Sequence, residues 1–84
     1  MEYELIEQVF DYRIDRLGGN NREVVQREIG EDSYLIASRG EARMFYEHAK
    51  LRHDVLLTLE IEVLNEKEAD MQHIIRRVIA SFPG

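Results

Sequence analysis

With 84 residues, the chain is long enough for one small domain, which we expect to span residues 1–84. A hydrophobic content of 44% is typical of a globular protein, and the lack of cysteine excludes disulfide bonds and cysteine-based zinc sites. The formal net charge of −6 disfavours non-specific attraction to nucleic acid or anionic lipid and favours a partner with a basic surface.

The first predicted element is an amphipathic helix over residues 2–17, ended by a pair of glycines. Its apolar residues recur at helical spacing and line one face: Leu5, Ile6, Val9, Phe10, Ile14 and Leu17. A shorter helix is predicted over residues 20–29, where Val25 and Ile29 share a face and Gly30 can end it.

The middle of the chain holds one ambiguous segment and one more predicted helix. Within residues 31–39, the apolar run fits either a short strand at 34–38 or the core of a short helix, because periodicity cannot separate the two at this length. Residues 41–52 are predicted to form a helix, since Phe45 and Ala49 fall on one face.

Residues 54–64 predict a long β-strand. Apolar and polar residues alternate along it, and this period of two places one face in a core and the other in water. A helix would spread the apolar residues around most of its circumference, and the β-branched residues of the segment also favour a strand. The apolar positions are Leu57, Leu59, Ile61 and Val63, and the polar ones are Thr58, Glu60 and Glu62.

The last predicted element is a helix that begins at Asn65, where Asn65 and Glu68 have the spacing of a capping box. Its apolar stripe comprises Met71, Ile74, Ile75, Val78, Ile79 and Phe82.

Together these elements predict a small, helix-rich α+β domain with one long strand; the alternative is an all-α fold. A strand at 34–38 would pair with the long strand in a β-α-β unit, with the helix at 41–52 as the crossover. Two strands make a marginal sheet, and oligomerisation is a means of stabilising a small chain that lacks cysteine. We therefore expect the sheet to be completed by a homodimer in which the long strand pairs with its own copy.

The predicted function is that of a small interaction or regulatory protein that binds another macromolecule. The expected interface takes its packing from the four apolar positions of the strand and its polar side from Glu60 and Glu62. The histidines at 48, 53 and 73 lack the spacing of a metal site, and no nucleophile or phosphate-binding motif is present. The sequence therefore predicts no catalytic, cofactor or metal site, and no enzyme.

A weak helix-turn-helix pattern at residues 22–39 supports the alternative of a small DNA-binding regulator. Its reading face would carry Ser33, Tyr34, Ser38 and Arg39, with Arg43 as a phosphate contact. The acidic charge argues against this alternative. The same charge motivates a further one, an acidic inhibitor that occupies the basic groove of a nucleic-acid-binding protein.

The sequence also predicts a cytoplasmic location without a membrane segment. Its first ten residues are acidic and lack the basic and apolar regions of a secretory signal. The longest uninterrupted apolar run, at residues 34–37, is far shorter than a membrane span.

Overall fold

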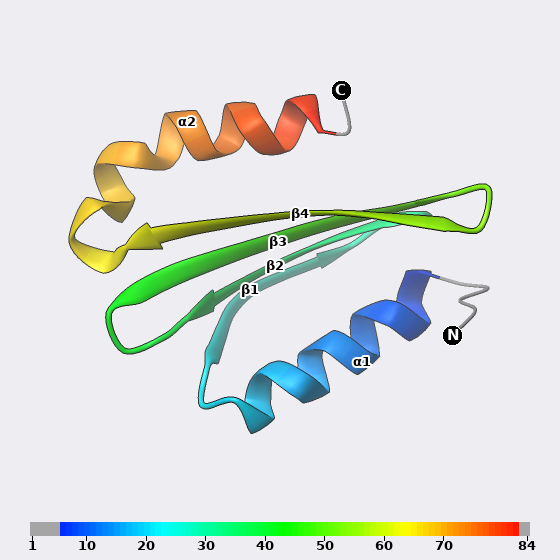
Figure 1. Cartoon of the computed structure of the whole chain (residues 1–84), viewed down its shortest axis with the longest axis horizontal. Coiled ribbons are helices and arrows are strands. Elements are labelled where there is room, and N and C mark those ends of the chain that lie inside the picture. The colour runs from blue at the N-terminus through cyan, green and yellow to red at the C-terminus, as the bar shows by residue number, and fades with distance from the viewer. Residues whose placement is uncertain (1–5, 83–84) are drawn as a thin grey trace.

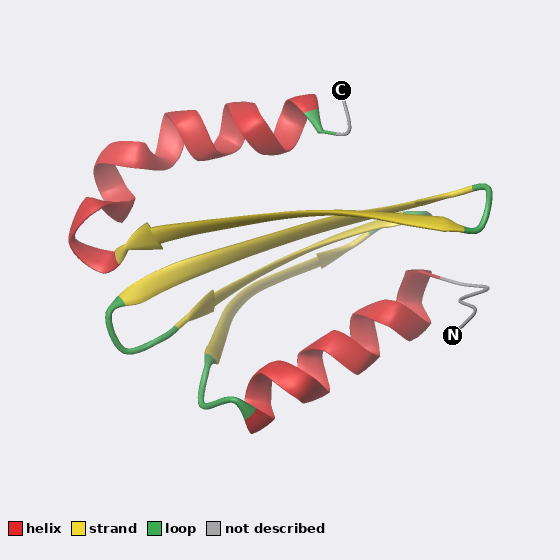
Figure 2. Cartoon of the chain, in the orientation of Figure 1, coloured by secondary structure: helices red, strands yellow, loops and turns green. Residues whose placement is uncertain are grey.

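A computed structural model describes residues 6–82 as a small α+β domain (Figure 1). Figure 2 shows that short turns connect the strands of its sheet. The elements in chain order are α1 (Ile6–Gly19), β1 (Glu23–Ile29), β2 (Ser33–Arg39), β3 (Arg43–Arg52), β4 (Val55–Leu64), the short 3-10 helix η1 (Asn65–Lys67) and α2 (Glu68–Ser81).

The four strands form one antiparallel sheet in the order β1-β2-β3-β4, so that each strand pairs with the next one in sequence. Pairing between β3 and β4 runs over their full length, from Arg52 opposite Val55 to Arg43 opposite Leu64. The helix α1 lies against β1 and β2 on one face, while α2 lies on the opposite face and contacts β4 (Figure 1). The sheet is therefore the middle layer of three.

Each helix closes its own hydrophobic core against the sheet. The core under α1 contains Ile6, Val9, Phe10, Leu17, Tyr34, Ile36 and Ala49. The core under α2 contains Ala37, Met44, Tyr46 and Ile75, with Ile61, Val63, Met71 and Ile79 packed against it. Because alternate residues of a strand point to opposite faces, β2 and β3 contribute to both cores and are buried on both sides.

The prediction of a helix-rich domain with one long strand is wrong, and so is the all-α alternative. Residues 20–29 contain the strand β1 instead of a helix, and residues 41–52 contain β3. Phe45 and Ala49 are four residues apart, as on one face of a helix, but β3 has apolar residues on both faces and therefore lacks the alternation of a half-buried strand. In β1, a bulge between Val24 and Gln26 breaks the alternation.

The ambiguous segment at 34–38 is a strand, and the long strand at 54–64 is confirmed as β4. The β-α-β unit is wrong, because a hairpin joins β2 to β3 and β3 is the direct neighbour of β4. The chain thus supplies its own four-stranded sheet, and no second copy is needed to complete a two-stranded one.

The two predicted terminal helices are confirmed as α1 and α2. The predicted start of the first one, at residues 2–5, lies outside the described residues. The predicted capping box before α2 is wrong. The chain passes through η1 first, and neither η1 nor α2 has a side-chain cap at its start; instead, Asn65 Nδ2 donates to the carbonyl oxygen of Glu41 at 3.5 Å.

A two-residue turn at His53 and Asp54 joins β3 to β4. Both residues adopt left-handed backbone conformations, with φ of 50° and 65°. Consecutive positive φ angles define the type I′ turn, whose twist matches that of the two strands. This turn fixes which residues of β4 bond to β3.

Candidate functional site

The outer edge of β4 is the candidate interaction site, because within residues 6–82 no strand pairs with it. In a hairpin closed by a two-residue turn, the flanking residues Arg52 and Val55 form a hydrogen-bonded pair, and such pairs then recur at every second position. At the other end, the N–H of Asn65 donates to the carbonyl of Ala42 at 3.0 Å, which fits the same alternation. The odd-numbered residues of β4 therefore bond to β3, and the even-numbered ones direct their N–H and C=O groups outward.

The four apolar residues predicted for the interface all lie on the face of β4 that α2 covers, but they are not equivalent. Ile61 and Val63 pack against the core under α2. Leu57 and Leu59 belong to neither core and are half-buried, and Val55 before them is 55% exposed. The first half of β4 thus presents apolar side chains that the chain itself covers only in part.

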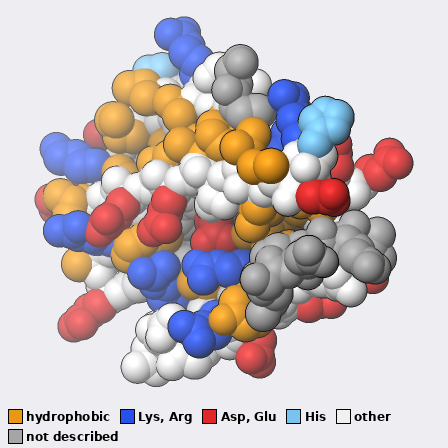
Figure 3. Space-filling model, turned by 45° about the vertical axis from the view of Figure 1, so that its right-hand side comes forward, with side chains coloured by type: hydrophobic (Ala, Val, Ile, Leu, Met, Phe, Trp, Pro, Cys, Tyr) orange, Lys and Arg blue, Asp and Glu red, His pale blue; other side chains and the backbone are white. Residues whose placement is uncertain are grey.

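An apolar flank of α2 extends this surface. Gln72, Arg76 and Ala80 line a groove above β1 and β2, so that flank of the helix faces the middle of the sheet. At about 100° per residue, Ile74 and Val78 fall on the opposite flank, which faces the β4 edge. They are 42% and 37% exposed. In Figure 3, apolar side chains gather in the upper part of the molecule, at the height that α2 has in Figure 1, and acidic side chains lie below them.

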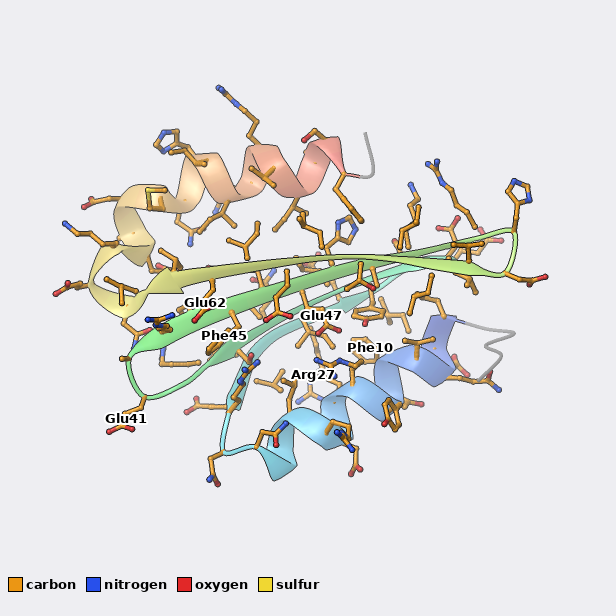
Figure 4. All side chains as sticks on the ribbon, in the orientation of Figure 1. Phe10, Arg27, Glu41, Phe45, Glu47 and Glu62 are labelled. Carbon is orange, nitrogen blue, oxygen red and sulfur yellow. The ribbon has the colours of Figure 1, made fainter. Side chains whose placement is uncertain are left out.

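The polar interface residues Glu60 and Glu62 are exposed on the opposite face of β4, the face on which α1 lies. Glu62 forms an ion pair with Arg43. Glu60 lies directly opposite Glu47 of β3, and Figure 4 shows Glu47, Phe45 and Glu62 on the α1 side of the sheet.

The other edge of the sheet is less suited to strand pairing. The strand β1 has seven residues against ten in β4 and contains the bulge between Val24 and Gln26. Short length and bulges are the features by which natural sheets protect an edge from another strand. Of the two edges, β4 is therefore the one that can accept a partner strand over a long, regular stretch.

The structure contains no helix-turn-helix at residues 22–39, because this segment is the hairpin of β1 and β2. Tyr34 and Ser38, two of the expected base readers, are 2% exposed and point into the domain. Ser33 is half-buried, while Arg39 and Arg43 are exposed on different strands. The residues proposed for reading DNA therefore do not form a common surface.

Sequence reasoning missed a groove of about 380 Å³ between α2 and the hairpin of β1 and β2. An adjoining hollow of about 360 Å³ is lined by His48, whose buried Nδ1 atom has no hydrogen-bond partner among residues 6–82. Burial lowers the pKa of His48, and the charge of Lys50 lowers it further. No signal in the sequence indicates the groove, because it forms only where the fold brings residues of β1 and α2, far apart in the sequence, together on one face of the sheet.

Tyr46 joins α2 to the sheet at the other end of the groove. Its hydroxyl donates to Glu68 Oε1 at 2.7 Å and accepts a hydrogen bond from Gln72 Nε2 at 2.9 Å. Burial raises the pKa of Tyr46, and the bond to Glu68 raises it further. Together these bonds fix the first turns of α2 over β3.

A comparison with protein-family models, with curated proteins and with solved structures found no match for this chain. No helix of the described residues is both long enough and apolar enough to cross a membrane. Within the same residues, no three His, Asp or Glu side chains lie close enough together to hold a metal ion.

Proposed function

We propose that this protein is a small, non-catalytic interaction or regulatory protein that works as a homodimer and acts by binding another macromolecule. The observation that carries the proposal is the open edge of β4, ten residues long and regular along its length. Backbone groups of such an edge form hydrogen bonds with an added strand, while side chains on either face give specificity. Ile74 and Val78 add apolar area beside that edge, where a solitary domain would leave them in water.

The proposal is tested by the mass of the protein in solution. We expect light scattering at micromolar concentration to give twice the 9.9 kDa of one chain. The Thr58→Pro variant removes an outward N–H from β4 without removing a bond to β3, so it should shift the mass towards one chain. Arg27→Pro is the matched control, because the N–H of Arg27 points outward from the β1 edge.

A mass of one chain for the unmodified protein would contradict the homodimer. Equal dissociation by Thr58→Pro and Arg27→Pro would place the interface elsewhere. Circular dichroism of both variants separates these outcomes from unfolding.

Electrostatics suggest the chemistry of the further macromolecule. With a net charge of −6, the protein is expected to favour a partner with a basic surface and to repel the phosphates of nucleic acid. Titration with random duplex DNA at low salt should therefore give no binding. Binding that falls steeply as salt is added would contradict this expectation.

A further inference from the structure

The geometry points to one register for the dimer, in which a two-fold axis passes beside Leu59 and joins the two sheets into one of eight strands. This inference rests on the proposed function, since it describes how two copies meet at the β4 edge. It adds the pairing partner of each residue along β4 and the contact between the two copies of α2.

Hydrogen bonding limits the registers to a small set. The outward N–H and C=O groups of β4 belong to its even-numbered residues, so an even residue must pair with an even residue of the second copy. A two-fold axis perpendicular to the sheet, midway between the two copies of β4, makes the strands antiparallel and places one residue opposite itself. The candidates for that residue near the middle of β4 lie between Leu57 and Ile61.

Charge and the length of the pairing then select among these candidates. With the axis at Glu60, Glu60 lies opposite itself. With the axis at Thr58, only residues 55–61 of each β4 can pair, and Glu62 faces the turn that contains Asp54 of the second copy. Like charges directly opposite each other destabilise a pair of strands. Only the axis at Leu59, between these two, avoids both arrangements.

Moving the axis one residue further in either direction is also unfavourable. An axis at Leu57 lets only residues 55–59 of each β4 pair, and an axis at Ile61 places Glu60 opposite Glu62. The axis at Leu59 pairs Glu60 with Thr58 of the second copy, so that no acidic residue of β4 lies directly opposite another.

The same axis matches apolar residues on the face that α2 covers. Leu59 meets itself, Leu57 meets Ile61, and Val55 meets Val63. These are the non-hydrogen-bonded pairs of the new ladder, in which side chains approach most closely. The apolar side chains that each copy leaves partly exposed thus cover one another.

Helix α2 reaches the axis with its apolar flank. Contacts of α2 and its C-terminal end with the sheet run from Tyr46, which is opposite Ile61, to His48, which is opposite Leu59. The ring centroid of His48 lies 5.8 Å from that of Phe82, directly after the helix. Ile74 and Val78 occupy the helical segment between these contacts. Their flank faces the β4 edge, and the corresponding flank of the second copy would face it across the axis.

Single cysteines test this register, because the chain contains none of its own. Residues facing each other in a non-hydrogen-bonded pair have Cα atoms about 4.5 Å apart, within the range of a disulfide. Under mild oxidation, we expect Leu59→Cys to give about tenfold more covalent dimer than Leu57→Cys or Ile61→Cys alone. An equimolar mixture of Leu57→Cys and Ile61→Cys should cross-link, since the register places these two positions opposite each other.

The outcomes separate the register from the dimer itself. If light scattering gives a dimer of the unmodified chain but Leu59→Cys does not cross-link, or Leu57→Cys cross-links alone, the register is wrong and the proposed dimer stands. A mass of one chain for the unmodified protein overturns both. Circular dichroism of each cysteine variant confirms that it is folded before oxidation.

Discussion

Arg13 of α1 and Glu47 of β3 form an ion pair between the helix and the sheet, with 2.6 Å between Arg13 Nη2 and Glu47 Oε1. Arg13 Nε donates to Glu47 Oε2 at 2.9 Å, and the hydroxyl of Tyr34 donates to the same oxygen at 2.5 Å. Glu47 is 7% exposed, and a carboxylate so buried needs such partners. The hydrogen bond with Glu47 also raises the pKa of Arg13. These hydrogen bonds and the ion pair attach α1 to the sheet.

We expect Arg13→Met to destabilise the fold by about 2–3 kcal/mol, because Glu47 would remain buried with one charged partner removed. The value is below that of a fully buried pair, since the Arg13 side chain is 32% exposed. Glu47→Gln keeps an acceptor for Tyr34 and should cost less, about 1–2 kcal/mol. Urea denaturation gives both values. A cost for Arg13→Met within about 0.5 kcal/mol of zero would show that water replaces the guanidinium adequately.

Tyr46 should make the fold sensitive to high pH. A raised pKa means that the folded state holds the phenolic proton more tightly than the unfolded state. The contribution of Tyr46 to the stability of the fold is therefore complete below pH 10.0, the ordinary pKa of tyrosine, and is lost as the pH rises through the pKa of the folded state. Tyr46→Phe should lower stability by about 1 kcal/mol at neutral pH and weaken the alkaline loss. Urea unfolding at neutral pH and at a pH above 10.0 tests this. If Tyr46→Phe loses as much stability at alkaline pH as the unmodified protein, Tyr46 is not the source of the loss.

His48 should make the fold less stable at acidic pH. Its pKa is lowered by burial, so that the unfolded chain binds a proton more readily than the folded protein. Stability then falls as the pH drops below 6.5, the ordinary value for histidine, and levels off below the folded pKa. His48→Gln keeps a polar side chain that does not titrate, and should flatten this part of the stability profile. A profile between pH 7 and 5 that is identical in both proteins would contradict the prediction.

The sequence predicted the elements whose periodicity reflects a single buried face. Both α1 and α2 have one apolar stripe, and β4 has an exposed polar face that leaves its alternation intact. The prediction for β3 was wrong because residues on both of its faces are buried, among them Met44 and Ala49. Burial on both faces depends on two helices far apart in the sequence, so no local pattern indicates it.

The candidate site was predicted in part for the same reason. The four apolar positions of β4 are visible in its alternation, but only the tertiary structure separates Ile61 and Val63, which pack in the core, from Leu57 and Leu59. This difference decides which substitution tests the interface. A charge at Ile61 would disrupt the core under α2, whereas positions outside both cores can be changed with the fold intact.

The flank of α2 offers such a position. Ile74→Glu adds a carboxylate to the flank of α2 that faces the proposed axis, so the like charges of the two copies should weaken dimerisation at least tenfold, about 1.4 kcal/mol. Ala80→Glu is the matched control, because it adds the same charge to the exposed opposite flank of the helix. Sedimentation at a series of protein concentrations gives the dissociation constant of each variant. Both substitutions change the net charge equally. Weaker dimerisation of Ile74→Glu alone would therefore locate the dimer contact on the β4 side of α2. Equal weakening by both variants would contradict this contact and indicate a general effect of charge.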